Sequence, residues 1–150
     1  MHRISRRVAT LFFVGYLPLL PGTLASLLGV GVYLLVRNNT PLYLILTAGL
    51  LILGFWSASC AEKTFTRKDP PQIVIDEFSS MLLVYLFVPF SAKFLITGFI
   101  LFRIFDIFKI PPIKKLQAYP AGYGIMLDDI AAAILTNIVL QVLRFAPFSF

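Results

Sequence analysis

The sequence has very few of the residues that act as nucleophiles or as soft metal ligands. It contains one cysteine, Cys60, and one histidine, His2, in 150 residues. A single cysteine cannot form an intrachain disulfide, and a zinc site built from cysteine and histidine ligands is excluded. Phosphatases of the Cys-x5-Arg type are excluded because Thr66 occupies the arginine position after Cys60. The lone His2 excludes histidine-dependent lipid phosphatases, and the Asp-x-Asp pattern of haloacid-dehalogenase phosphatases is absent.

Charged residues are also scarce, at 13% of the chain against about 25% in a soluble domain. Apolar residues make up 59% of the chain, and the mean hydropathy is +0.88. They occur in continuous runs rather than in one helical stripe, which is typical of helices surrounded by lipid. The sequence therefore predicts an all-α fold, a polytopic integral membrane helical bundle that forms one domain over residues 1–150.

Five apolar segments are expected to form the helices of this bundle: 23–36, 42–60, 78–88, 94–108 and 130–143. A membrane span needs about 20 residues, and several of these segments approach that length only if their charged ends are included. Acidic residues are therefore expected inside the helix ends, at the depth of the lipid headgroups. Residues 1–20 have the charge and hydrophobicity of a signal peptide. Because Pro18, Pro21 and Gly22 interrupt the apolar stretch, we expect an interfacial or re-entrant segment there instead.

The distribution of basic residues predicts the orientation. With the N-terminus in the cytoplasm and five crossings, basic residues concentrate on the cytoplasmic side, as the positive-inside rule requires. All seven acids fall on the same side. The formal charge of +6 suits an anionic lipid better than a nucleic acid, because no basic face stands apart from the apolar segments. The cytoplasmic set is Arg3, Arg6, Arg7, Lys63, Arg67, Lys68, Arg103, Lys109, Lys114 and Lys115, and the external set is Arg37, Lys93 and Arg144.

Five of the acids lie at the ends of apolar segments. Asp76 and Glu77 precede the third segment, Asp106 lies near the end of the fourth, and Asp128 and Asp129 precede the fifth. Ionised groups at such positions are costly and indicate a functional site. The alternative is helix capping, because acids in a first turn complement the helix dipole.

Basic residues accompany these acids. Arg103, Asp106 and Lys109 are spaced i, i+3, i+6 and would form one stripe on the last turns of the fourth helix. They could form only an intrahelical salt bridge. Alternatively, Asp106 would join the acids while Arg103 and Lys109 bind phosphate oxygens. Thr23, in the Pro-Gly-Thr sequence before the first segment, marks either a simple helix start or an anion site at a helix N-terminus.

Five carboxylates without a usable histidine or cysteine form the ligand set of a hard cation such as Mg²⁺, completed by substrate phosphate. The glycines at 122 and 124 could bring backbone close to phosphate or could form a simple turn. The candidate metal ligands and catalytic acids are Asp76, Glu77, Asp106, Asp128 and Asp129, and the candidate phosphate-binding residues are Arg103, Lys109 and Thr23.

Four motifs carry a resemblance to a known family: LPGTLAS at 20–26, IVIDEF at 73–78, FRIFDIFKIPPI at 102–113 and GYGIMLDD at 122–129. In order and spacing they resemble the phosphatidylglycerophosphatase A family of bacterial membrane enzymes. The resemblance implies Mg²⁺-dependent hydrolysis of phosphatidylglycerophosphate to phosphatidylglycerol and phosphate, at the cytoplasmic face of the inner membrane. On that reading the family's acidic and basic positions fall on the acids named above and on Arg103 and Lys109. The chain departs most from the family between Lys115 and Gly122.

Two other functions remain open from the residues alone. One is a divalent-cation channel or transporter, although acids on one side only do not line a path across a bilayer. The other is a non-catalytic membrane assembly protein in which the acids only cap helices. Within the enzyme interpretation, the sequence leaves open which carboxylate is the base and whether a phospho-aspartyl intermediate forms.

Overall fold

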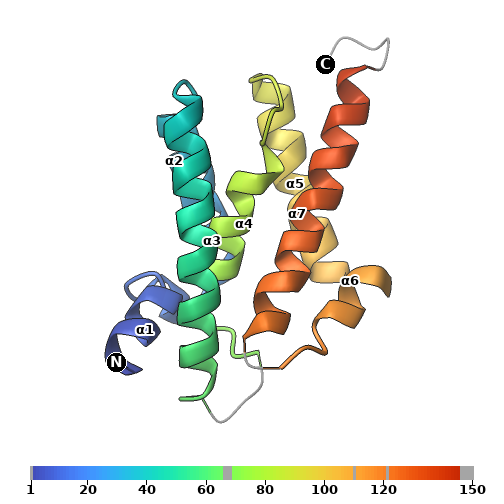
Figure 1. The fold of residues 1–150 in the computed structure, drawn as a ribbon. Coiled ribbons are helices and arrows are strands. Elements are labelled where there is room, and N and C mark those ends of the chain that lie inside the picture. The colour runs from blue at the N-terminus through green and yellow to red at the C-terminus, as the bar shows by residue number, and fades with distance from the viewer. Residues whose placement is uncertain (1, 66–68, 110, 121, 146–150) are drawn as a thin grey trace.

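The computed structural model describes residues 2–65, 69–109, 111–120 and 122–145, and every regular element in these ranges is a helix (Figure 1). The all-α prediction is therefore confirmed for the described part of the chain. The α-helices are α1 (His2–Ala9), α2 (Pro21–Val36), α3 (Thr40–Glu62), α4 (Ile75–Val84), α5 (Ala92–Phe108), α6 (Pro111–Leu116) and α7 (Tyr123–Arg144), and a short 3-10 helix, η1, covers Val14–Tyr16.

The five predicted apolar segments correspond to α2, α3, α4, α5 and α7. Two of these, α3 and α7, are long and apolar enough to cross a membrane, whereas α2 is a shorter apolar helix. The ten residues of α4 extend for about 15 Å, half the thickness of the hydrocarbon core. Five crossings therefore stay a prediction. The segment predicted as interfacial or re-entrant, residues 1–20, contains α1 and η1, and α6 lies outside all the predicted segments.

Many apolar side chains lie on the surface of the bundle, and some polar side chains are buried inside it. Ile96, Ile100 and Ile104 form an exposed apolar row on α5, at the i, i+4, i+8 spacing of one helix face. Ser80 and Thr136 are fully buried between helices instead. Exposed apolar faces of this extent mark a surface that contacts lipid or another protein. With the two candidate spans, this distribution agrees with a membrane-associated bundle.

The helix α4 lies at the centre of the bundle and packs against α2, α3, α5 and α7. Its buried Met81 and Leu82 belong to the main apolar core. The last carbonyl groups of a helix have no partner within it, and here the side-chain amide of Asn137 on α7 donates to the carbonyls of Val84 and Leu86, each at 2.9 Å. The end of α4 is thus tied to α7, and this fixes where its first turn lies.

The two ends of the bundle differ in the number of basic residues that they carry. In Figure 1, α1, the C-terminal end of α3 and the start of α7 lie toward the lower end, and the α2–α3 turn and the end of α7 lie at the upper end. The lower end carries the described members of the predicted cytoplasmic set. Arg37, Lys93 and Arg144 belong to the upper end. Arg67 and Lys68 fall outside the described residues.

Candidate active site

The first turn of α4 presents Asp76 and Glu77. The N-cap of this helix is Val74, whose side chain makes no capping hydrogen bond, so neither acid is the N-cap. Asp76 is 6% exposed, and the side chain of Glu77 is 15% exposed. Acids in a first turn do complement the helix dipole, but burial to this degree is not expected of an ordinary dipole contact.

The other acid pair lies deeper in its helix than the sequence predicted. Because α7 begins at Tyr123 rather than at residue 130, Asp128 and Asp129 occupy its second turn, and the N-cap is Gly122. Capping is therefore the wrong interpretation of this pair. Each of the two aspartates is only 2% exposed.

Three acids from two helices converge at one point. One carboxylate oxygen from each of Asp76, Glu77 and Asp129 lies within 4.8 Å of the other two. In the part of the chain that the structure describes, each of these residues also has a buried carboxylate oxygen without a hydrogen-bond partner. Buried polar oxygens are normally satisfied, so their convergence fits a hard divalent cation. We call Asp76, Glu77 and Asp129 the acid triad.

Asp106, on α5, lies next to the acid triad. Its carboxylate is in electrostatic contact with Glu77 and Asp129, and it is 9% exposed. Acids from α4, α5 and α7 therefore meet in one buried region, although about 50 residues separate the first from the last in the chain. Asp128 is in electrostatic contact with Asp76 and Asp106 as well, so all five predicted acids lie in this region.

Arg103 connects this region to α2. Its Nη1 lies 2.8 Å from Asp106 Oδ2, one turn along α5, and 3.8 Å from Glu77 Oε1 on α4. The same nitrogen donates to Ser26 Oγ of α2 at 3.4 Å. Arg103 Nε is buried and has no hydrogen-bond partner among the described residues. The intrahelical salt bridge thus exists, but Arg103 also contacts two other helices and retains a donor.

The Pro-Gly-Thr sequence places the N-terminal end of α2 against Glu77. A β-carbon built on Gly22 would lie 2.0 Å from Glu77 Oε1 and 3.5 Å from Arg103 Nη1. A larger residue at this position would displace the end of the Glu77 side chain. Thr23 follows in the same first turn and is half-buried. Since the first amides of a helix have no intrahelical acceptor, this end of α2 can bind an anion beside the triad.

Lys109 does not continue the stripe of Arg103 and Asp106. The helix α5 ends at Phe108, and Lys109 is its C-cap in the left-handed region, with φ of 39°. The predicted stripe is therefore wrong at Lys109. The left-handed backbone turns the Lys109 ammonium toward α7, where it donates to Asp128 Oδ2. It also lies 3.9 Å from Asp69. Burial lowers the pKa of Lys109, but the hydrogen bond and charge of Asp128 and the charge of Asp69 outweigh it, so the pKa lies above its ordinary value.

Asp128 therefore faces Lys109 and is not part of the triad. Its Oδ1 accepts from the amide of Asp129 at 3.1 Å. The Lys109–Asp128 pair, beside Asp129, would place the ammonium group of Lys109 near a substrate phosphate. The roles predicted for Lys109 and Asp128 stay predictions.

Three polar residues near the site were missed by the sequence analysis. Glu62, at the end of α3, accepts from the backbone amides of Gly122 and Asp69. Asp69 accepts from Gln117 Nε2 at 2.7 Å. These contacts join segments far apart in the chain without any periodic pattern, so no local signal in the sequence predicts them. The amide of Gly122 is thus used within the protein, which favours the structural interpretation of the glycine turn.

Known proteins are similar to this chain over most of its length. The family model described as "Phosphatidylglycerophosphatase A" matches residues 7–144. A Bacteroides thetaiotaomicron protein, provisionally named as a phosphatidylinositol-3-phosphatase, is 33% identical in an alignment of 148 positions that covers 91% of each chain. Two proteins named phosphatidylglycerophosphatase A are also similar. The Haemophilus influenzae protein is 36% identical over 83% of this chain and 79% of its own, and the Escherichia coli protein is 30% identical over 86% and 77%. No solved structure is significantly similar to the chain.

Proposed function

The chain belongs to the phosphatidylglycerophosphatase A family, and we propose that its substrate is phosphatidylglycerophosphate. As a member of this family it is a hydrolase of phosphoric monoesters. The proposed products are phosphatidylglycerol and inorganic phosphate. The observation that supports the proposal most is the acid triad of buried, unpaired carboxylate oxygens with Arg103 beside it.

We propose that the triad holds Mg²⁺, because oxygen ligands suit this cation and no histidine or cysteine is present among its three residues. When bound, Mg²⁺ would offset negative charge on the phosphoryl oxygens and lower the pKa of a coordinated water. Phosphoryl transfer depends mainly on positioning and electrostatic stabilisation. Both can come from the residues around the triad.

In this proposal Arg103 binds a phosphoryl oxygen of the substrate. Its contacts with Asp106, Glu77 and Ser26 fix the guanidinium, and its buried Nε is an unused donor. Lys109, oriented by Asp128, supplies a second positive charge. The first turn of α2, with Thr23, offers backbone amides to the phosphate beside Glu77. A carboxylate of the triad or Asp106 takes the proton from the attacking water.

The distribution of basic residues supports a proposal for the orientation in the membrane. We propose that the lower end of the bundle in Figure 1 is cytoplasmic and that α2, α3, α4, α5 and α7 cross the bacterial cytoplasmic membrane. Two exposed positions test this in a Cys60→Ser background. Lys114→Cys on α6 should react with an impermeant maleimide only from the cytoplasmic side, and Asn38→Cys in the α2–α3 turn only from the periplasmic side. The reverse pattern would overturn the orientation.

The substrate is tested with the purified protein in a neutral detergent. Phosphate release is measured from phosphatidylglycerophosphate, phosphatidylinositol 3-phosphate and phosphatidic acid, each with Mg²⁺ or with EDTA. We expect the largest kcat/KM for phosphatidylglycerophosphate and no turnover in EDTA. A larger kcat/KM for phosphatidylinositol 3-phosphate would reject the substrate and agree with the name of the Bacteroides relative. Full turnover in EDTA would reject the metal instead.

A further inference from the structure

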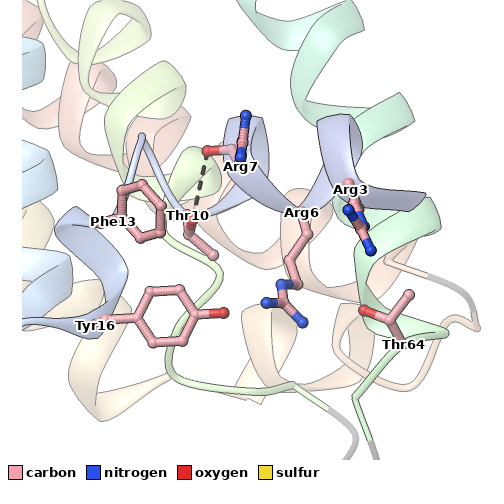
Figure 2. Close-up of a pocket in the computed structure, with 7 residues that line it drawn as sticks. All are labelled: Arg3, Arg6, Arg7, Thr10, Phe13, Tyr16 and Thr64. Atoms are coloured by element: carbon pink, nitrogen blue, oxygen red, sulfur yellow. Dashed lines mark hydrogen bonds between the residues drawn. The ribbon is translucent and has the colours of Figure 1, made fainter. Parts of the chain in front are cut away.

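A polar cavity lies at the N-terminal end of the protein and is lined by none of the acidic residues. Its volume is about 530 Å³, and α1, the segment through η1 and the residues after α3 enclose it (Figure 2). The lining includes Arg3, Arg6 and Arg7 of α1, together with Phe13, Tyr16 and Thr64. None of the residues of the acid triad, and neither Arg103 nor Lys109, contributes to it.

The three arginines that line the cavity share one face of α1. Residues 3, 6, 7 and 10 follow the i, i+3, i+4, i+7 pattern of one helix face. Ala9 lies outside this pattern and is buried, with α1 packed against α3. The helix is therefore amphipathic, and its charged face is the wall of the cavity.

The positive charge in this cavity is not neutralised. No carboxylate lines it, and among the described residues no ion pair involves Arg3, Arg6 or Arg7. Figure 2 shows Arg6 reaching into the space between Tyr16 and Thr64, with the Tyr16 hydroxyl facing the guanidinium. Guanidinium groups and hydroxyls gathered around an open space recognise phosphate through several donors.

The surroundings of the cavity are apolar. Phe12 is 73% exposed and Phe13 is 62% exposed, and Leu11, Phe12 and Phe13 all adopt positive φ angles. This left-handed turn, unusual for three successive bulky residues, presents the aromatic rings beside the arginines. The exposed side chains continue through Leu17, Leu19 and Leu20. Arginines next to exposed aromatic and aliphatic side chains form the pattern that binds a lipid at the membrane interface.

We propose that this cavity binds the phosphate of an anionic phospholipid that the protein does not hydrolyse. The phosphodiester lies among Arg3, Arg6 and Tyr16, and the acyl chains lie along the exposed apolar side chains of the 11–20 segment. The cavity has no acidic residue to hold a divalent cation, so it binds the lipid without turnover. This inference concerns a site separate from the acid triad and does not depend on the substrate proposed above.

The test counts bound lipid on the whole protein. The purified protein in a neutral, non-ionic detergent is titrated with phosphatidylmethanol, an anionic phosphodiester lipid that is neither substrate nor product, and bound lipid is measured by native mass spectrometry. Phosphatidylcholine is the neutral comparison, and inorganic phosphate is the soluble competitor. The variant Arg3→Gln/Arg6→Gln/Arg7→Gln removes the cavity charge. Its matched control, Lys63→Gln/Lys114→Gln/Lys115→Gln, removes the same charge from exposed positions at the same end of the bundle.

We expect one tightly bound phosphatidylmethanol and no comparable binding of phosphatidylcholine. Each arginine removed should weaken the affinity about fivefold, and the arginine triple variant roughly a hundredfold. The lysine triple variant should change it less than about twofold, because none of its positions lines the cavity. Equal losses in the two triple variants, or unchanged binding in the arginine variant, would overturn the proposal. Full displacement by millimolar inorganic phosphate would assign the cavity to free phosphate and overturn the lipid.

A photoactivatable phosphatidylmethanol with the reactive group near the headgroup gives a second measurement on the unaltered protein. Crosslinks within residues 3–16 and at Thr64 are expected. Crosslinks found only on α4, α5 or α7 would place the bound lipid in the acid region and contradict the inference.

Discussion

Gly22, in the first turn of α2, lies against the carboxylate of Glu77, in the first turn of α4, and leaves no room for a β-carbon. Two helix N-terminal ends therefore meet at one member of the acid triad. Arg103 bridges them through Ser26 and Glu77. The Pro-Gly-Thr sequence has a steric role here as well as any role in binding anions.

Replacing Gly22 with alanine should therefore reduce activity more than stability. The new methyl group would displace the Glu77 carboxylate, and a displacement of about 1 Å in a catalytic region lowers kcat by up to about a hundredfold. Gly31→Ala is the matched control, because it lies in the same helix and a β-carbon there meets nothing within 4 Å. Phosphate release and thermal unfolding of both variants decide the point. Equal activity in the two would contradict the steric role.

Removing one carboxylate charge from the triad should abolish metal binding without unfolding the protein. Asp129→Asn keeps the shape of the side chain but weakens the ligand, and we expect about a hundredfold or larger loss of kcat. Mg²⁺ should raise the unfolding temperature of the wild type, and Asp129→Asn should lose this shift. Asp106→Ala should also lose activity, since Asp106 positions Arg103. Retained activity in both variants would reject the assignment of the site.

The Lys109–Asp128 pair can be tested by a double-mutant cycle. Lys109→Gln leaves the buried Asp128 unpaired, and we expect the free energy of unfolding to fall by about 2 kcal/mol, below the range for fully buried pairs because the Lys109 side chain is 24% exposed. Lys109→Gln/Asp128→Asn should recover most of this stability, as measured by thermal unfolding. It should not recover activity if Lys109 binds phosphate. A fully active double variant would show that the pair is only structural.

Gly122→Ala should destabilise the protein. A β-carbon there would lie 2.4 Å from the backbone nitrogen of Ser59, and φ is +72°. Overpacking and the left-handed conformation together should lower the free energy of unfolding by about 2–3 kcal/mol. Gly49→Ala on α3 is the control, because a β-carbon there meets nothing within 4 Å. Similar thermal unfolding of the two variants would contradict this expectation.

Much of the helical architecture could be predicted, because apolar runs determine where the central helices lie. The boundaries could not. The apolar run of α7 begins at Ile130, but the helix begins at Tyr123, since Gly122 adopts the left-handed N-cap and donates to Glu62. That contact spans 60 positions in the chain and has no local signal. The same boundary decides whether Asp128 and Asp129 cap a helix or lie buried within it.

The acids of the site could be chosen from the sequence, but their grouping could not. Scarcity and position identified all five, and the structure places Asp76, Glu77 and Asp129 together with Asp106 beside them. Asp128 lies beside this group and pairs with Lys109, because the left-handed backbone of Lys109 ends α5 and its ammonium reaches α7. Spacing alone extends the helix through Lys109 and therefore predicts a stripe instead.

The N-terminal segment contacts the residues that precede Asp76 through a backbone hydrogen bond and close packing. The amide of Val74 donates to the carbonyl of Ala9 at 2.9 Å, two residues before Asp76, and Gly15 packs against the carbonyl of Gln72. A fusion partner attached ahead of α1 would therefore disturb the segment that positions Asp76. One attached after α7 would lie at the opposite end of the bundle.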